Sequence, residues 1–237
     1  MHIFQKIIVK KTSAYIIVNH TEDLAKLITA AQTGDERVVK RMMRSSTDDD
    51  PSSIEAAEFN RTAILIASAN GRENVVKLLL DLGTSVNVGC PLGWTPLHFA
   101  AKEGHVSIIR LLLQRGANPG AKSNLHEDPP GTARHLTPLM LAAQNGITEI
   151  AKLILDSGGK STINDQEKNG ACALIYAAIN GNLELTKLLV ENGADVDAED
   201  QNGWNAMKWA IEKGHAEVMK FLRSKSTASE NDRPTEG

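Results

Sequence analysis

The sequence is poor in residue types on which several protein classes depend. Aromatic residues make up only 4% of the 237 residues, which disfavours a sheet-rich core, because strands favour aromatic and β-branched side chains. Two cysteines, Cys90 and Cys172, cannot build a disulfide framework or a four-ligand zinc site, and free thiols fit a reducing compartment. The net charge of −3 provides no general basic surface for nucleic acid or an anionic membrane.

Long apolar runs are also missing, so the sequence predicts neither membrane insertion nor a cleaved signal peptide. Near the N-terminus, two apolar stretches are separated by Lys10 and Lys11. The lysines and the lack of acids in residues 1–21 resemble a mitochondrial presequence, whereas the absence of arginine favours a strand or an irregular cap. Both interpretations stay open for an N-terminal extension of residues 1–23. For the chain as a whole we expect a cytoplasmic or nuclear, intracellular location.

The sequence does contain one pattern that recurs six times with a base period of 33 residues. Its clearest copy, copy three, begins with Thr95-Pro96-Leu97-His98, passes Gly104 and ends at Gly116. The mid-copy glycines are spaced by 37, 33, 42, 35 and 33 residues: Gly34, Gly71, Gly104, Gly146, Gly181 and Gly214. Six recurrences of one frame indicate a repeat architecture.

Each residue type in copy three has a physical reason to be there. Thr95 can cap a helix start, and Pro96 suits the first helical position, where no hydrogen bond is lost. Gly104 can end this helix in a left-handed conformation that is costly for other residues. Apolar residues at helical spacing follow, with Ile108, Leu111 and Leu112 predicted to form one buried stripe. The copy therefore predicts a helix–turn–helix.

This pattern resembles the ankyrin repeat. The resemblance implies an all-α ankyrin-repeat solenoid of about six helix–turn–helix units joined by short hairpin-like fingers. We expect an ankyrin repeat domain over residues 24–223, followed by a disordered tail over 224–237. The six units are predicted at about 24–44, 60–87, 93–120, 135–164, 170–198 and 203–223, with insertions at 45–58 and 122–135 that form exposed loops.

Several copies depart from the family pattern. Copies two, five and six begin with Thr62-Ala63-Ile64-Leu65, Cys172-Ala173-Leu174-Ile175 and Asn205-Ala206-Met207-Lys208. These changes weaken individual helix starts, so we expect copies two and five to be locally less stable than copy three. The first and last copies carry extra charged residues, as the polar ends of a stack require.

No catalytic, cofactor-binding or metal-binding constellation emerges, so the sequence predicts a protein that is not an enzyme. Gly159-Lys160-Ser161 resembles the end of a phosphate loop, but Ile154 stands where the first glycine belongs and no strand is predicted before it. In the second insertion, His126, the acids that follow it and His135 match no zinc spacing. We interpret that segment as a solvated loop.

Three histidines receive structural interpretations. His105 and His215 follow mid-copy glycines, a position that the resemblance marks as turn-stabilising. His98 is expected to hydrogen-bond between repeats.

Two segments carry candidate modification sites. Ser45, Ser46 and Thr47 are each followed at the third place by an acid, the pattern that acid-directed kinases favour. At Asn87, the resemblance implies a position open to asparaginyl hydroxylation, while the alternative is a turn asparagine that bonds to the backbone.

The resemblance also implies a protein partner, bound on a concave surface lined by finger tips and first-helix positions. Trp94 and Trp204 are the predicted anchors, with packing as their alternative, and Trp209 is predicted to lie in the core. The candidate contacts are Leu92, Trp94, Lys102, Glu103, Gln144, Asn145, Lys168, Asn169, Ile179, Asn180, Gln201, Asn202, Trp204, Glu212 and Lys213. We expect a monomeric scaffold or adaptor, or alternatively a regulatory or inhibitory subunit of an enzyme or transcription factor.

Overall fold

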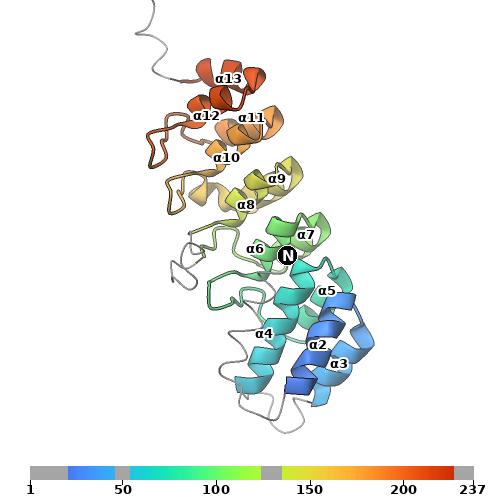
Figure 1. The fold of residues 1–237 in the computed structure, drawn as a ribbon. Helices are drawn as coiled ribbons and strands as arrows, with labels where there is room; N and C mark the ends of the chain where they lie inside the picture. The colour runs from blue at the N-terminus through green and yellow to red at the C-terminus, as the bar shows by residue number, and fades with distance from the viewer. Residues whose placement is uncertain (1–20, 46–53, 124–134, 227–237) are drawn as a thin grey trace, which may run out of the picture. The chain divides into compact units, whose positions relative to one another are not determined.

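A computed structural model describes residues 21–45, 54–123 and 135–226 (Figure 1). Within these ranges the extended elements amount to one isolated bridge between Glu199 and Asn205, and all other regular elements are helices. The predicted all-α repeat fold is therefore confirmed. The predictions for residues 1–20, for Ser46 and Thr47, for residues 124–134 and for the tail beyond 226 lie outside the described residues.

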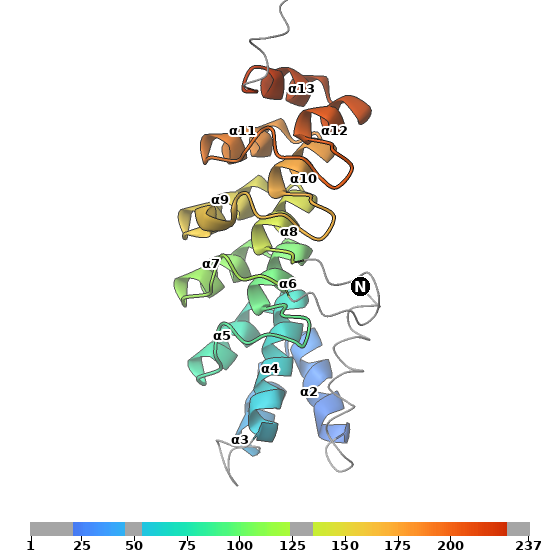
Figure 2. The ribbon, with the colours of Figure 1, turned by 90° about the vertical axis from the view of Figure 1, so that its left-hand side faces the viewer.

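The chain divides into an N-terminal unit, Met1–Asn118, and a C-terminal unit, Pro119–Gly237. In the N-terminal unit the first helices of the copies pack in the order α2, α4, α6, and the second helices form a row of α3, α5 and α7 beside them (Figure 2). Their bounds are α2 Thr21–Thr33, α3 Glu36–Ser45, α4 Ile54–Ala69, α5 Glu73–Asp81, α6 Pro96–Glu103 and α7 Val106–Gln114.

The C-terminal unit repeats the same arrangement. Its first helices pack in the order α8, α10, α12, and its second helices in the order α9, α11, α13. Their bounds are α8 Pro138–Gln144, α9 Thr148–Asp156, α10 Ala173–Ile179, α11 Leu183–Glu191, α12 Ala206–Glu212 and α13 Ala216–Arg223, with the 3₁₀ helix η1 at Gly159–Thr162. Each copy buries its apolar side against its neighbours within the unit, which is why no copy needs a core of its own.

Two helices begin earlier than the sequence analysis predicted. Helix α2 begins at Thr21 instead of residue 24, and α4 begins at Ile54, inside the insertion that was expected to be a loop. Residues 54–59 contain neither proline nor glycine and include good helix formers such as alanine and glutamate. With Phe59 also buried, the helix extends backwards from the predicted start.

The helix ends of copy three follow the predicted chemistry. Thr95 precedes α6 in an extended conformation and takes part in a capping box with His98, and Pro96 is the first helical residue. Gly104 ends the helix at φ +81°, in the left-handed region that glycine adopts without steric cost. The sequence therefore set both ends of this helix locally.

The core consists mainly of leucine, isoleucine and alanine side chains. In α7 the buried residues are Ile108, Ile109 and Leu112, so the predicted stripe is corrected at Leu111, which is only half-buried. Truncating a fully buried leucine such as Leu112 to alanine costs about 2–5 kcal/mol. The fully buried Ala100 and Ala101 leave room for adjacent first helices to approach.

Candidate functional site

The first residue after the mid-copy glycine reaches back to the preceding copy. His105 Nε2 lies 3.2 Å from the carbonyl oxygen of Ala69, and His215 Nε2 lies 3.0 Å from that of Ile179. Since a carbonyl only accepts, Nε2 carries the proton in both rings. The predicted stabilising role of these histidines is confirmed, and the structure shows that they join consecutive copies.

His98 bonds to the residue that precedes its own helix. Its fully buried ring accepts a hydrogen bond at Nδ1 from the Thr95 backbone N–H at 3.2 Å, and Nδ1 lies 2.9 Å from the Thr95 hydroxyl oxygen. Both bonds stay at the start of α6. Nδ1 therefore satisfies a helix terminus, while a bond of His98 between repeats stays a prediction.

Asn87 bonds to backbone, as one of its two interpretations predicts. Its side-chain amide donates to the carbonyl of Gly116 at 3.2 Å, and its Oδ1 accepts from the Asn118 N–H at 2.8 Å. Asn164 occupies the same position in the C-terminal unit, where it bonds to Gly193 and Asp195 in the same way. These asparagines tie each finger to the next copy, while hydroxylation of Asn87 stays a prediction.

Leu92 and Trp94 are not surface anchors. Each side chain is only 4% exposed. The Trp94 ring lies 5.2 Å from the ring of Phe99 and 5.8 Å from that of His98, measured between centroids. The prediction that Leu92 and Trp94 contact a partner is therefore corrected, because side chains buried to this extent are packing residues.

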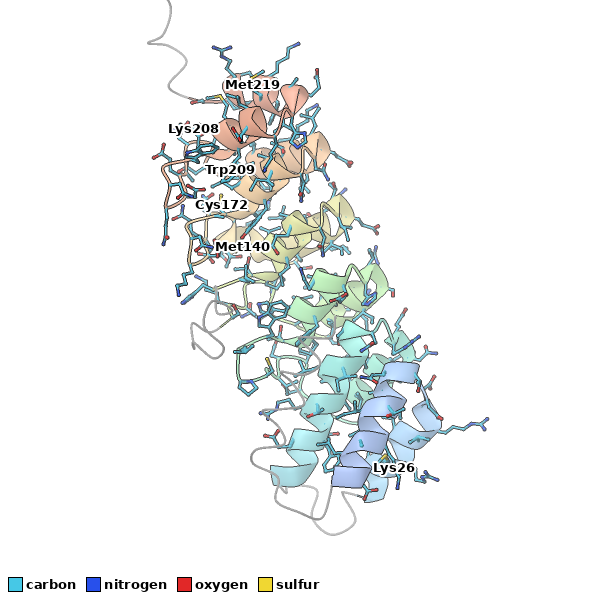
Figure 3. The ribbon with its side chains drawn as sticks, viewed as in Figure 1. Lys26, Met140, Cys172, Lys208, Trp209 and Met219 are labelled. Carbon is cyan, nitrogen blue, oxygen red and sulfur yellow. The ribbon has the colours of Figure 1, made fainter. Side chains whose placement is uncertain are left out.

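Trp204 and Trp209 form an accessible aromatic pair in copy six. Both side chains are half-buried, with ring centroids 4.9 Å apart and planes tilted by 55°. Trp209, expected in the core, donates its indole N–H to Asp200 Oδ2 at 2.9 Å, and the Lys213 ammonium lies 5.8 Å from its ring centroid. Figure 3 shows Trp209 and Lys208 at the same end of the C-terminal unit. Of the two predicted anchors, only Trp204 keeps an accessible surface.

Asp200 holds together the hairpin-like finger that precedes α12, which consists of residues 199–204 and is called finger six. Partial desolvation by itself would raise the pKa of its carboxyl group. Hydrogen bonds from the backbone N–H groups of Trp204 and Asn202 and from the Trp209 indole outweigh that effect and lower the pKa below its usual value. Asp200 is therefore an ionised acceptor that fixes the two tryptophans.

The other candidate contacts are mostly accessible. Lys102, Gln144 and Ile179 are half-buried, and the rest are exposed: Glu103, Asn145, Lys168, Asn169, Asn180, Gln201, Asn202, Glu212 and Lys213. Asn180 also has a structural role, because its side-chain amide donates to the carbonyls of Ala143 at 3.0 Å and Gln144 at 2.7 Å. Within each unit, these positions lie on fingers and on the C-terminal ends of first helices.

Hydrogen bonds between consecutive fingers were not predicted from the sequence. Gln201 donates its backbone N–H to Asn169 at 2.9 Å, and the Gln166 side-chain amide donates to the carbonyl of Glu199 at 2.9 Å. The glutamines at 166 and 201 are the signal in the sequence, since a long amide side chain can reach an adjacent backbone. Each glutamine bonds to a residue of the neighbouring copy that is 32 or 33 positions away, which made the pairing hard to recognise.

Features that suggested chemistry have structural roles. The segment Gly159-Lys160-Ser161 lies in η1, which follows helix α9 and not a strand. Burial raises the pKa of the Cys90 and Cys172 thiols, which disfavours reactive thiolates. Across the described ranges, no group of three or more metal-ligating side chains is suitably placed, and no helix is long and apolar enough to span a membrane.

Stacked helix pairs with bonded fingers define a helical repeat protein, a class that presents extended binding surfaces. The chain belongs to the ankyrin repeat family: the family model "Ankyrin repeats (3 copies)" matches residues 27–123 and 139–233, and "Ankyrin repeats (many copies)" matches 97–155. Ankyrin repeats mediate protein–protein interaction, so the coarse functional class is protein binding.

Curated relatives support the same family. An ankyrin repeat and KH domain-containing protein of Caenorhabditis briggsae is 32% identical over 69% of this chain and 6% of its own length. The palmitoyltransferase AKR1 of Lachancea kluyveri is 32% identical over 84% of this chain and 26% of its own length. A B-cell lymphoma 3 protein homologue of Mus musculus is 31% identical over 57% of this chain and 28% of its own length. The chain thus spans less than a third of each relative.

Proposed function

We propose that this chain is a monomeric scaffold or adaptor that binds a partner protein through its fingers and first-helix ends. The supporting observation is that successive copies of the C-terminal unit leave polar side chains exposed at equivalent places. Lys168 and Asn169 lie on one finger, Gln201 and Asn202 on the next, and Glu212 with Lys213 ends α12. Exposed side chains repeated at equivalent places of consecutive copies suit recognition of a partner.

We propose that the partner is a protein and not a nucleic acid, because a net charge of −3 provides no general basic surface. We place the protein in the cytoplasm or nucleus. In the N-terminal unit, Lys102 and Glu103 end α6 at the position that Glu212 and Lys213 occupy in α12, and they extend the candidate surface of that unit.

Crosslinking mass spectrometry on the full chain in its own cells tests the proposal. Crosslinks to a partner should concentrate on Lys168 and Lys213, and Lys168→Glu combined with Lys213→Glu should weaken a recovered complex at least tenfold. Lys152→Glu, an exposed change on the second helix α9, is the matched control and should leave affinity unchanged. Equal loss with the control, or the absence of any reproducible partner, contradicts the proposal.

The alternative role as a regulatory or inhibitory subunit uses the same surface. It is distinguished by adding the purified chain to the recovered partner and measuring the partner's own activity. If the chain changes the partner's activity and the variant Lys168→Glu does not, the role is regulatory. If the chain binds the partner and leaves its activity unchanged, the role is that of a scaffold.

A further inference from the structure

The fingers of copies five and six form successive rungs of a hydrogen-bonded ladder. Finger five is residues 166–171 and finger six is residues 199–204. Gln201 of finger six donates its backbone N–H to the Asn169 carbonyl at 2.9 Å and its side-chain amide to the Lys168 carbonyl. Figure 2 shows the two fingers one above the other, projecting beside α10 and α12. At this contact two backbone carbonyls of finger five accept from the backbone and side-chain amides of Gln201, and the Gln166 side-chain amide donates in the opposite direction to the Glu199 carbonyl.

A glycine allows this close approach. A Cβ atom at Gly170 would lie 2.8 Å from the backbone nitrogen of Gln201 and 2.9 Å from Cα of Asp200. Real Cβ atoms do not come so near to backbone, so any other residue at position 170 would push the two fingers apart. The ladder therefore depends on the carbonyls of Lys168 and Asn169 and on the absence of a side chain at Gly170.

Finger six presents similar features on its far side, where the Lys208 ammonium donates to the Gly203 carbonyl at 2.6 Å. The carbonyls of Gln201 and Asn202 correspond to those of Lys168 and Asn169, and among the described residues neither accepts a hydrogen bond. Gly203 corresponds to Gly170, yet the nearest atom to a Cβ there would be Glu199 Oε2, 3.9 Å away. Finger six can therefore accept one more rung.

The aromatic pair lies beside this open edge. Trp204 is the last residue of finger six, it is half-buried, and its ring packs at a tilt against that of Trp209. Its indole N–H has no acceptor among the described residues, whereas that of Trp209 is used by Asp200. A partly exposed indole with an unused donor offers both apolar surface and one directional bond.

We infer that finger six is the docking edge for an extended segment of a partner protein, which adds to the ladder as its next rung. The segment donates a backbone N–H to the Asn202 carbonyl and a glutamine or asparagine amide to the Gln201 carbonyl. An apolar side chain covers Trp204, and a carbonyl of the segment accepts from its indole. This docking edge continues the interface between fingers five and six, and the inference rests on the proposed protein-binding function.

Selection of a phage library of random twelve-residue peptides on the full chain tests this inference. We expect enriched peptides to carry an amide side chain near an apolar residue. Binding should shift the ¹⁵N–¹H signals of Gly203 and of the Trp204 indole. N-methylation of the paired peptide amide should weaken binding about tenfold or more, because it removes the donor.

Two variants of the chain complete the design. Trp204→Ala should weaken binding at least tenfold, and Gly203→Ala should do the same by placing a methyl group in the open slot. Gly214→Ala is the control, because Gly214 has a similar φ, +75° against +70°, and also has open space around it. Circular dichroism checks that all three variants retain the helical fold.

Several results overturn the docking edge. Peptides that bind equally well to the Gly203→Ala variant, or that tolerate N-methylation, contradict it. So does a selection that returns no peptide shifting the NMR signals of finger six. Self-association of the chain that Gly203→Ala abolishes also contradicts it, because the edge would then bind a second copy. Peptides that map to other fingers or to first-helix ends reject this edge while leaving the proposed function standing. Failure of the proposed function is seen separately, as the absence of a crosslinked partner.

Discussion

Copies five and six have the same helix–turn–helix, yet equivalent positions have opposite environments. Ile175 in α10 is 1% exposed, whereas its counterpart in α12 is the exposed Lys208. Ala178 is fully buried, whereas its counterpart Ile211 is 57% exposed. Copy six packs on this face of copy five, and nothing in the described chain packs on the same face of copy six. Whether a repeat position is core or surface is decided by its neighbour and not by its place in the motif.

The largest expected effect on stability comes from replacing a buried residue of copy five with its exposed counterpart in copy six. Ile175→Lys should destabilise the protein by about 3–5 kcal/mol, because it removes buried apolar surface and desolvates a charge. Lys208→Ile should change stability by less than about 1 kcal/mol, since its contact with Glu199 at 3.3 Å is solvent-exposed. Urea unfolding midpoints measure both. Similar losses for the two variants would mean that α12 is covered like α10.

The next effect concerns the glycines at the middle of the same copies. A Cβ at Gly181 would lie 2.5 Å from the His215 ring, whereas Gly214 has nothing within 4 Å. Both have positive φ, so alanine should cost about 1–2 kcal/mol of backbone strain at either site. Gly181→Ala should cost about 1–3 kcal/mol more, because His215 must move. Equal thermal shifts for the two variants would show that the His215 contact contributes nothing.

A smaller effect is expected at the helix starts. Asn205 caps α12 by accepting from the Lys208 N–H at 3.0 Å, whereas Cys172 at the start of α10 makes no side-chain cap bond. Cys172→Thr should stabilise the protein by about 0.5–1 kcal/mol, and Asn205→Ala should destabilise it by about 1 kcal/mol. Hydrogen exchange of the first-turn amides localises both changes. A destabilised Cys172→Thr would show that packing around the thiol matters more than the cap.

The smallest effect is a pH dependence confined to copy six. The pKa of Asp200 is lower in the folded protein than its usual value, so its stabilisation is fully present above the unfolded pKa of about 3.9. It is lost as the pH falls through the folded pKa. The variant Asp200→Asn should therefore lose less stability than the unmodified protein as the pH falls below about 4. Tryptophan fluorescence during thermal unfolding measures it, and an unchanged acid profile would contradict the assignment.

Local sequence signals predicted the elements well and the contacts between copies poorly. Thr95, Pro96 and Gly104 act within one turn of chain, so their roles could be derived from residue chemistry alone. Trp94 and Trp204 both follow a glycine just before a first helix, yet one is buried and the other half-exposed. That difference depends on residues far away in sequence, and the pairing of Gln201 with Asn169 was missed for the same reason.

By itself, the sequence determined the repeat period, the helical class and most helix ends, because these depend on interactions over a few residues and on spacing that recurs six times. Tertiary structure alone decided which side chains stay accessible. It buried Trp94, left Trp204 and Ile211 partly in solvent, and joined finger five to finger six while leaving the far edge of finger six open. The physical reason is that burial and backbone pairing belong to contacts between copies, which no single copy encodes.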